Sequence, residues 1–231
     1  MLDELKQKVC AANLELFNKN AVIYTWGNVS EFDRSKNLIV IKPSGIAYEN
    51  LTPDDMVIVD VSTGEVKEGR WKPSTDTPTH LELYRAFSEI CGVAHTHSIN
   101  ATAFAQAGIN IPALGTTHAD YFFGDIPCTR ELSEQEIKEN YESNTGKLIV
   151  ETIQNLNSTP LELPGILVKN HGVFTFGRNA NEAAFNAVVL EKIAEIAFKT
   201  LLLNDQATIS RHLLEKHFER KHGQNAYYGQ I

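Results

Sequence analysis

The sequence predicts an α/β protein in which layers of helices flank one sheet. Short apolar runs separated by turn residues dominate the first third of the chain, and longer helical patterns dominate the rest. A mixture of this kind buries its apolar surfaces by packing helices onto the faces of a sheet. Because no repeat or linker divides the 231 residues, we expect a single domain over residues 1–231.

The first expected elements are one helix and several strands. An apolar stripe at helical spacing predicts a helix over residues 2–20. Turns rich in Gly, Pro and Asn then separate three strand-like runs, at residues 21–25, 38–41 and 56–61. Pro78 suits the first position of the next helix, because proline is preorganised there. Gly92 follows that helix and starts another strand.

The second half of the chain is mainly helical and contains one hairpin. We expect a helix at residues 98–107, a polar helix behind the capping-box pair Ser133 and Glu136, and a further helical stretch at 148–156. Two strands should then form a hairpin around His171.

Asn179 is placed to cap the longest helix, which we expect over residues 181–203 and which another helix follows. Its apolar positions recur at helical spacing, so we expect them to form the buried side. These positions are Ala184, Val188, Ile193, Ile196 and Leu201.

The composition excludes several classes of partner. A formal net charge of −8 argues against nucleic acid or an anionic membrane surface, since both require clustered Lys and Arg. No apolar run approaches the roughly 20 residues of a membrane span, and the first residues lack the pattern of a signal peptide. Cys10, Cys91 and Cys128 are far apart and form no CxxC motif, which suits reduced thiols that pack. We therefore expect a cytoplasmic enzyme.

Three histidines lie at the ends of apolar runs. His95 and His97 end the strand that starts at Gly92, and residues two apart on a strand point to the same side. His171 lies beside another β-rich run. Three neutral imidazoles can bind a divalent metal and leave one coordination position open, as in catalytic zinc sites. The spacing alone is also compatible with a strand end whose rings are solvated or satisfied in the core.

Two polar segments offer hydrogen-bond donors for an anion. Ser74-Thr75-Asp76 precedes the expected helix N-terminus, where backbone N–H groups attract anions. Ile41-Lys42-Pro43-Ser44-Gly45 combines a glycine with hydroxyl and ammonium donors that suit phosphate. Ordinary helix capping by Asp76 or Thr77, and a simple turn, would explain the same residues.

Taken together, these motifs resemble the class II aldolase family, and within it the branch of L-ribulose-5-phosphate 4-epimerases. The stretches that carry the resemblance occur in the same order along essentially the whole chain: Thr25-Trp26-Gly27-Asn28-Val29-Ser30, Ile41-Lys42-Pro43-Ser44-Gly45, Ser74-Thr75-Asp76-Thr77-Pro78-Thr79-His80, Ala94-His95-Thr96-His97-Ser98, Gly115-Thr116-Thr117-His118-Ala119-Asp120-Tyr121 and the tail from Arg220 to Gln230. Residues 111–117 and 121–125 are most similar to the ascorbate-utilisation type, although arabinose catabolism also leads to the same substrate.

The resemblance implies a three-layer α/β/α fold with a central, largely antiparallel sheet. It also implies one Zn²⁺ per subunit, a sugar-phosphate substrate, and a homotetramer with active sites at subunit interfaces. Asp76, His95, His97 and His171 fall on metal positions, and whether Asp76 ligates directly or orients a ligand stays open. Asp120 and Tyr228 fall on proton-transfer positions, expected to reach the site from a neighbouring subunit. The substrate-binding positions fall on Gly27, Asn28, Ser44, Gly45, Ser74 and Thr75.

The implied reaction interconverts L-ribulose 5-phosphate and D-xylulose 5-phosphate. The hydrogen on C4 is β to the C2 carbonyl, so deprotonation there is not available, whereas retro-aldol cleavage of the C3–C4 bond is. A metal stabilises the resulting enediolate as a Lewis acid, and one proton-transfer group is needed on each side of the aldehyde.

Three other functions remain as alternatives. These are a metal-dependent aldolase acting on another phosphorylated sugar, a zinc hydrolase, and a non-catalytic sugar-phosphate binding module. No HExxH motif supports the hydrolase. The remaining histidines that we considered are expected to be structural or solvent-facing: His80, His217 and His222.

Overall fold

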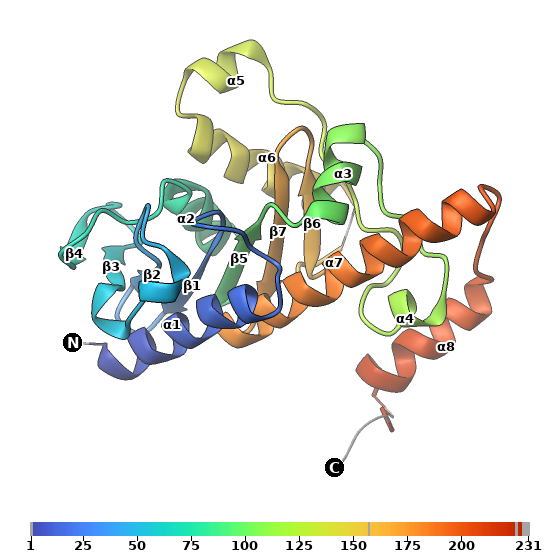
Figure 1. Cartoon of the computed structure of the whole chain (residues 1–231), viewed down its shortest axis with the longest axis horizontal. Coiled ribbons are helices and arrows are strands. Elements are labelled where there is room, and N and C mark those ends of the chain that lie inside the picture. The colour runs from blue at the N-terminus through green and yellow to red at the C-terminus, as the bar shows by residue number, and fades with distance from the viewer. Residues whose placement is uncertain (1, 157, 225, 228–231) are drawn as a thin grey trace.

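The computed structural model describes residues 2–156, 158–224 and 226–227, and these residues form one antiparallel sheet of seven strands (Figure 1). The order across the sheet is β4-β3-β2-β1-β5-β7-β6, and each neighbouring pair runs antiparallel. The strands are β1 (Asn28–Asp33), β2 (Leu38–Ile41), β3 (Val57–Asp60), β4 (Val66–Glu68), β5 (Gly92–Thr96), β6 (Gly165–Val168) and β7 (Gly172–Gly177). The predicted α/β class with a central antiparallel sheet is confirmed.

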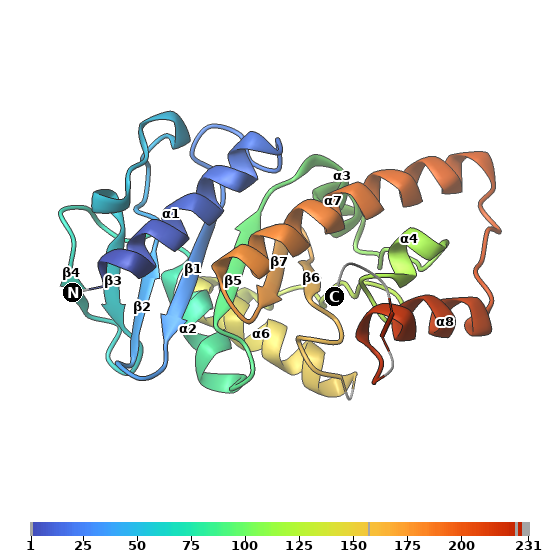
Figure 2. The same cartoon turned by 90° about the horizontal axis from the view of Figure 1, so that it is seen from below.

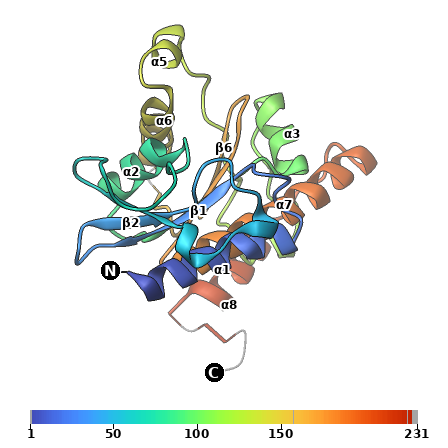
Figure 3. The same ribbon diagram turned by 60° about the vertical axis from the view of Figure 1, so that its left-hand side comes forward.

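Helices cover both faces of the sheet. α1 (Asp3–Asn18) and α7 (Ala180–Leu203) lie across one face, and α2 (Thr77–Ala86) and α6 (Tyr141–Asn155) lie on the other (Figures 2 and 3). The remaining helical segments are α3 (Ile99–Ala107), α4 (Thr116–Ala119), α5 (Glu134–Lys138), α8 (Arg211–His222) and the short 3-10 turns Tyr48–Asn50 and Pro53–Asp55. α8 packs against α4.

The strands alternate between two apolar cores. On β2, Leu38 and Val40 pack with α1 and α7, whereas Ile39 and Ile41 pack with α2 and α6. All four side chains are buried, as expected for a strand whose two faces are both covered. A third apolar cluster joins α3 and α7 to the segment 111–126. The sheet that carries the histidines is therefore supported from both sides.

Most expected elements are confirmed, two expectations are wrong, and two strands were missed. Residues 21–25 form no strand: the chain bends at Ala21 and turns at Tyr24 and Thr25, with Tyr24 at φ 55°. β1 and β4 were not predicted as strands. Ile196 is 51% exposed because it lies on the outer side of α7. Asn179 does cap α7, since its side chain accepts a hydrogen bond from the backbone N–H of Glu182.

None of the helices in the described ranges combines the length and the apolar character that crossing a bilayer requires.

Candidate metal centre and substrate pocket

The ends of two neighbouring strands bring three histidines together. His95 lies in β5, His97 follows that strand by one residue, and His171 lies in the turn between β6 and β7. Because β5 pairs with β7 from Gly92 to Thr96, this turn lies beside the end of β5. The candidate ligand atoms of the three side chains all lie within 4.8 Å of one another. The structure therefore gathers the three histidines that the sequence singled out.

The geometry of this cluster fits a divalent metal ion. Nδ1 of His95 lies 2.9 Å from the carbonyl oxygen of Val173, which can only accept, so Nδ1 carries the proton and Nε2 presents a lone pair. Nε2 of His95 and Nε2 of His97 are 3.0 Å apart. Tetrahedral Zn–N bonds of about 2.0–2.1 Å would place two ligand nitrogens roughly 3.4 Å apart, close to this spacing.

Burial keeps the imidazoles in the form that binds metals. Desolvation, followed by the influence of His95, lowers the pKa of His97 to about 4. The same causes, together with His97, lower the pKa of His171 to about 3. Since a metal binds neutral imidazole, these side chains are competent ligands at neutral pH.

Asp76 contributes its side chain to the same site and not to a helix cap. It occupies the N-cap position of α2, yet its side chain makes no capping hydrogen bond, so the capping explanation for Asp76 is wrong. Its Oδ2 instead accepts a hydrogen bond of 2.7 Å from Nδ2 of Asn28. Burial alone would raise the pKa of Asp76, but His95, His80 and His171 outweigh it and lower the pKa overall. The carboxylate is therefore ionised beside the cluster.

A cavity of about 490 Å³ lies beside the histidines. Asp76, His97 and His171 line it, whereas His95 is 1% exposed and lies behind them. The six residues expected to bind substrate also line this cavity: Gly27, Asn28, Ser44, Gly45, Ser74 and Thr75.

The two polar segments are joined into one rim of the cavity by backbone hydrogen bonds. Ser74 N donates to the carbonyl oxygen of Lys42, and Ser44 N donates to that of Lys72, both at 3.0 Å. Asn28 connects this rim to the Asp76 side, because its Nδ2 also donates to Oγ of Ser74 at 3.0 Å. Hydroxyls and backbone groups from distant parts of the sequence thus face one space.

Lys42 is the buried cation of this rim. Its Nζ donates to the carbonyl oxygen of Ile46 at 2.9 Å and lies 4.7 Å from the centre of the Tyr48 ring. Desolvation lowers the pKa of Lys42 to about 8. A bound anion would favour the charged form, so the side chain is suited to gain a partner of opposite charge.

Comparison with known proteins assigns the family. The class II aldolase and adducin N-terminal domain matches residues 7–198. The chain belongs to this family. Class II aldolases depend on a metal ion, usually Zn²⁺, and the cluster of His95, His97 and His171 could hold one.

Solved structures of this family share the fold. An L-fuculose 1-phosphate aldolase is 24% identical with a TM-score of 0.78, covering 94% of this chain and 95% of that one. The L-fuculose 1-phosphate aldolase from Glaciozyma antarctica PI12 is 21% identical with a TM-score of 0.76, covering 98% and 85%. YgbL from Escherichia coli, for which aldolase, epimerase and decarboxylase activities are all suggested, is 22% identical with a TM-score of 0.71, covering 93% and 97%.

Asp120 of this class II aldolase family member lies outside the cavity, at the end of α4. Arg220 donates to both of its carboxylate oxygens, at 3.0 and 2.7 Å, and Nδ1 of His217 lies 3.0 Å from one of them. Burial would raise the pKa of Asp120, but Arg220 and His217 lower it. Nε2 of His222 lies 3.0 Å from the Asp120 carbonyl oxygen. Tyr228 lies outside the described residues.

Five residues that line the cavity were given no role from the sequence: Thr25, Trp26, Pro43, Tyr141 and Glu142. The ring of Trp26 lies 6.4 Å from that of His97, and the Tyr141 hydroxyl lies 3.4 Å from Nδ1 of His171. The position of Trp26 directly before Gly27 was a usable signal. No signal marks Tyr141 and Glu142, because α6 brings them to the site from 30 residues away.

Proposed function

We propose that this class II aldolase family member is an L-ribulose-5-phosphate 4-epimerase. It interconverts L-ribulose 5-phosphate and D-xylulose 5-phosphate with Zn²⁺ bound by His95, His97 and His171. The observation that carries this proposal is the pairing, in one cavity, of an imidazole cluster suited to a metal with a rim of donors suited to phosphate.

The reaction breaks and re-forms one carbon–carbon bond. The C4 hydroxyl loses its proton and C4–O becomes an aldehyde carbonyl, while the C3–C4 electron pair moves into an enediolate over C2 and C3. A bound metal ion supplies Lewis acidity for the negative charge that develops on the substrate. The aldehyde fragment turns, the same electron pair attacks its other face, and the proton returns to the C4 oxygen. The C4 configuration is then inverted.

The rim residues hold the phosphate while the aldehyde turns. The Ser44 and Ser74 hydroxyls and the Lys42 ammonium are donors of the kind that phosphate oxygens accept, and Asn28 holds Ser74 in place through its Nδ2. Gly45 has φ 71° and no atom within 4 Å of a would-be Cβ, so the backbone is open to a ligand there. Retention of the fragment distinguishes an epimerase from an aldolase, because a released aldehyde cannot recombine in place.

Asp120 and Tyr228 are proposed as the two proton-transfer groups, contributed by a neighbouring subunit of a homotetramer. In this chain Arg220 donates to the Asp120 carboxylate and Nδ1 of His217 lies 3.0 Å from it, and these contacts keep the carboxylate ionised. Asp76 is proposed to ligate the metal or to orient a ligand, through the position that Asn28 gives its carboxylate. A cytoplasmic location and a place in ascorbate or arabinose catabolism stay predictions from the sequence.

Paired substitutions test this assignment. We expect Asp120→Asn and Tyr228→Phe each to lower turnover of L-ribulose 5-phosphate by about 10²–10⁴-fold, with zinc content unchanged. Asp54→Asn and Tyr227→Phe are matched controls on exposed side chains and should retain turnover. Full activity in both proton-transfer variants would refute their roles and would favour a binding module.

The alternative is a metal-dependent aldolase acting on another phosphorylated sugar. Its support is the structural similarity to L-fuculose 1-phosphate aldolases, which reaches a TM-score of 0.78. Net release of an aldehyde during turnover would decide for this alternative.

A further inference from the structure

His171 contacts Tyr141, a residue of α6 and not of the strands β5, β6 and β7 that position the three histidines. Tyr141 is the first residue of α6, and its hydroxyl lies 3.4 Å from Nδ1 of His171, with the two rings 6.0 Å apart. Residues 130–140, here called the α5 arm, precede Tyr141 and end at Asn140, which has φ 55°. Figures 1 and 3 show α5 projecting from the body of the protein, beyond α6.

A ligand histidine requires a partner on its outer nitrogen, because that hydrogen bond fixes both the tautomer and the orientation of the ring. For His95 the partner is the carbonyl oxygen of Val173. His171 lies in a turn, after Asn170 at φ 61°, and the contact on its Nδ1 is the Tyr141 hydroxyl. A phenolic oxygen can accept from an imidazole N–H.

We infer that Tyr141 is a positioning residue, whose hydroxyl oxygen accepts from Nδ1–H of His171 and directs Nε2 of that ring into the metal cluster. This inference rests on the metal site of the proposed function. It adds a role for a residue to which neither strand pairing nor the sequence motifs point. Since Tyr141 comes from α6 and not from the sheet, the position of its hydroxyl depends on how the arm and α6 are held.

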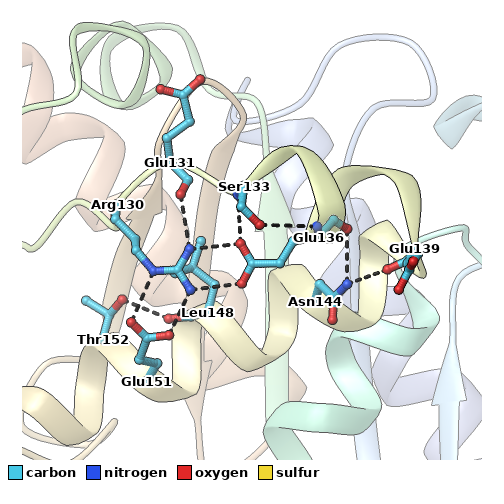
Figure 4. Close-up of polar contacts among 9 residues, drawn as sticks. All are labelled: Arg130, Glu131, Ser133, Glu136, Glu139, Asn144, Leu148, Glu151 and Thr152. Atoms are coloured by element: carbon cyan, nitrogen blue, oxygen red, sulfur yellow. Dashed lines mark hydrogen bonds and ion pairs between the residues drawn. The ribbon is translucent and has the colours of Figure 1, made fainter.

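Arg130 clamps the α5 arm to α6 (Figure 4). Its guanidinium donates to both carboxylate oxygens of Glu136 in α5, each at 2.9 Å, and to both oxygens of Glu151 in α6, at 3.1 and 2.9 Å. Glu136 also closes a capping box with Ser133. Bidentate pairs of this kind, between an Arg guanidinium and a carboxylate, fix the relative orientation of the two side chains in addition to pairing their charges. Arg130, the first residue of the α5 arm, is therefore bonded to α6, the helix that follows the arm.

The chain is also held where the arm enters α6. Nδ2 of Asn144 donates to the carbonyl oxygen of Glu136 at 3.0 Å and to that of Glu139. Oγ1 of Thr79, in α2, donates to the carbonyl oxygen of Glu142 at 2.6 Å. These contacts fix the backbone on both sides of Tyr141. The side chain of Arg130 is 44% exposed, so solvent screens its ion pairs and we assign the clamp a geometric role.

Zinc affinity tests the inference directly. We expect Tyr141→Phe to bind Zn²⁺ about 10- to 100-fold more weakly than wild type in competition with a chelator, with an unchanged far-UV circular dichroism spectrum. The visible spectrum of the Co²⁺-loaded variant should also change, because it reports ligand geometry. Tyr24→Phe, which removes a hydroxyl from a 73% exposed side chain, is the control and should bind as wild type.

An affinity of Tyr141→Phe within twofold of wild type would refute the positioning role. If wild type itself bound no Zn²⁺ at the histidines, the metal site of the proposed function would fail instead, so the two failures are distinguishable.

A second variant leaves every cavity residue unchanged. Arg130→Ala should weaken zinc binding in the same direction, by a few-fold, whereas Arg178→Ala removes a comparable exposed ion pair with Glu182 and should have no effect. Equal zinc affinity in these two variants would refute the clamp.

Discussion

Replacement of Gly27 by alanine should damage the metal cluster through the backbone. Gly27 has φ 86°, a region that residues with a side chain rarely adopt. An added Cβ would lie 2.6 Å from the carbonyl oxygen of His95 and 2.9 Å from Cγ1 of Val22. Because Asn28 pairs with His95 across β1 and β5, relief of this clash must move the strand end that carries a proposed ligand.

The magnitude follows from two separable costs. A left-handed backbone conformation costs an alanine about 1–2 kcal/mol, and an extra methyl group forced into a packed region costs about 1–3 kcal/mol. We therefore expect Gly27→Ala to lower the free energy of unfolding by about 2–5 kcal/mol in total. Gly45→Ala is the matched control, since Gly45 has φ 71° but no atom within 4 Å of its would-be Cβ. Only the first cost applies to Gly45.

Urea denaturation of both variants at equal protein concentration, together with zinc competition, measures the two effects. We expect Gly27→Ala to be less stable than Gly45→Ala by about 1–3 kcal/mol. We also expect it to bind Zn²⁺ at least about tenfold more weakly, because displacing a residue that positions a metal ligand lowers metal affinity by about this factor. Equal stability and equal zinc affinity in the two variants would refute the steric argument.

Three further outcomes are expected from the site. His95→Asn should retain no Zn²⁺ after dialysis and no turnover, and a zinc content equal to wild type would exclude His95 as a ligand. Burial lowers the pKa of His80 to about 3 and that of His97 to about 4, whereas both titrate near 6.5 when unfolded. Below about pH 6.5 the unfolded state of the metal-free protein therefore binds more protons than the folded state. The urea midpoint of unfolding should fall as the pH drops from about 6.5 to 5, and a midpoint independent of pH would contradict this. Lys42→Met should raise KM for the phosphate substrate about 10- to 100-fold, because a hydrogen bond to a charged group contributes about that much to binding. Zinc affinity should not change. An unaltered KM would show that Lys42 does not bind the phosphate.

β1, one of the two strands that were not predicted, shows a limit of pattern reasoning. β1 was missed because buried positions of this strand are polar. The Asn28 amide bonds to Asp76, and the Ser30 hydroxyl lies 2.7 Å from Nδ1 of His80. A strand whose inner side chains are satisfied by other polar groups shows no apolar alternation in the sequence. Such partners become visible only in three dimensions.

The site residues also divide into those that the local sequence indicates and those that only the tertiary structure shows. His95 and His97 were predictable, because the spacing of residues on a strand is local. His171 was predictable from the hairpin around it. Tyr141 was not, because its contact with His171 depends on the packing of α6 against α2 and on the clamp at Arg130. Local periodicity therefore made the histidines candidates, the family resemblance made them and Asp76 the proposed ligands, and tertiary packing determined what holds them.

The most direct test of the central claim is to incubate the zinc-loaded and the chelator-stripped protein with L-ribulose 5-phosphate, and to measure D-xylulose 5-phosphate and free glycolaldehyde phosphate together. The account predicts D-xylulose 5-phosphate from the zinc-loaded protein alone, without accumulation of the free aldehyde. Net aldehyde release, or equal conversion by the stripped protein, would contradict it.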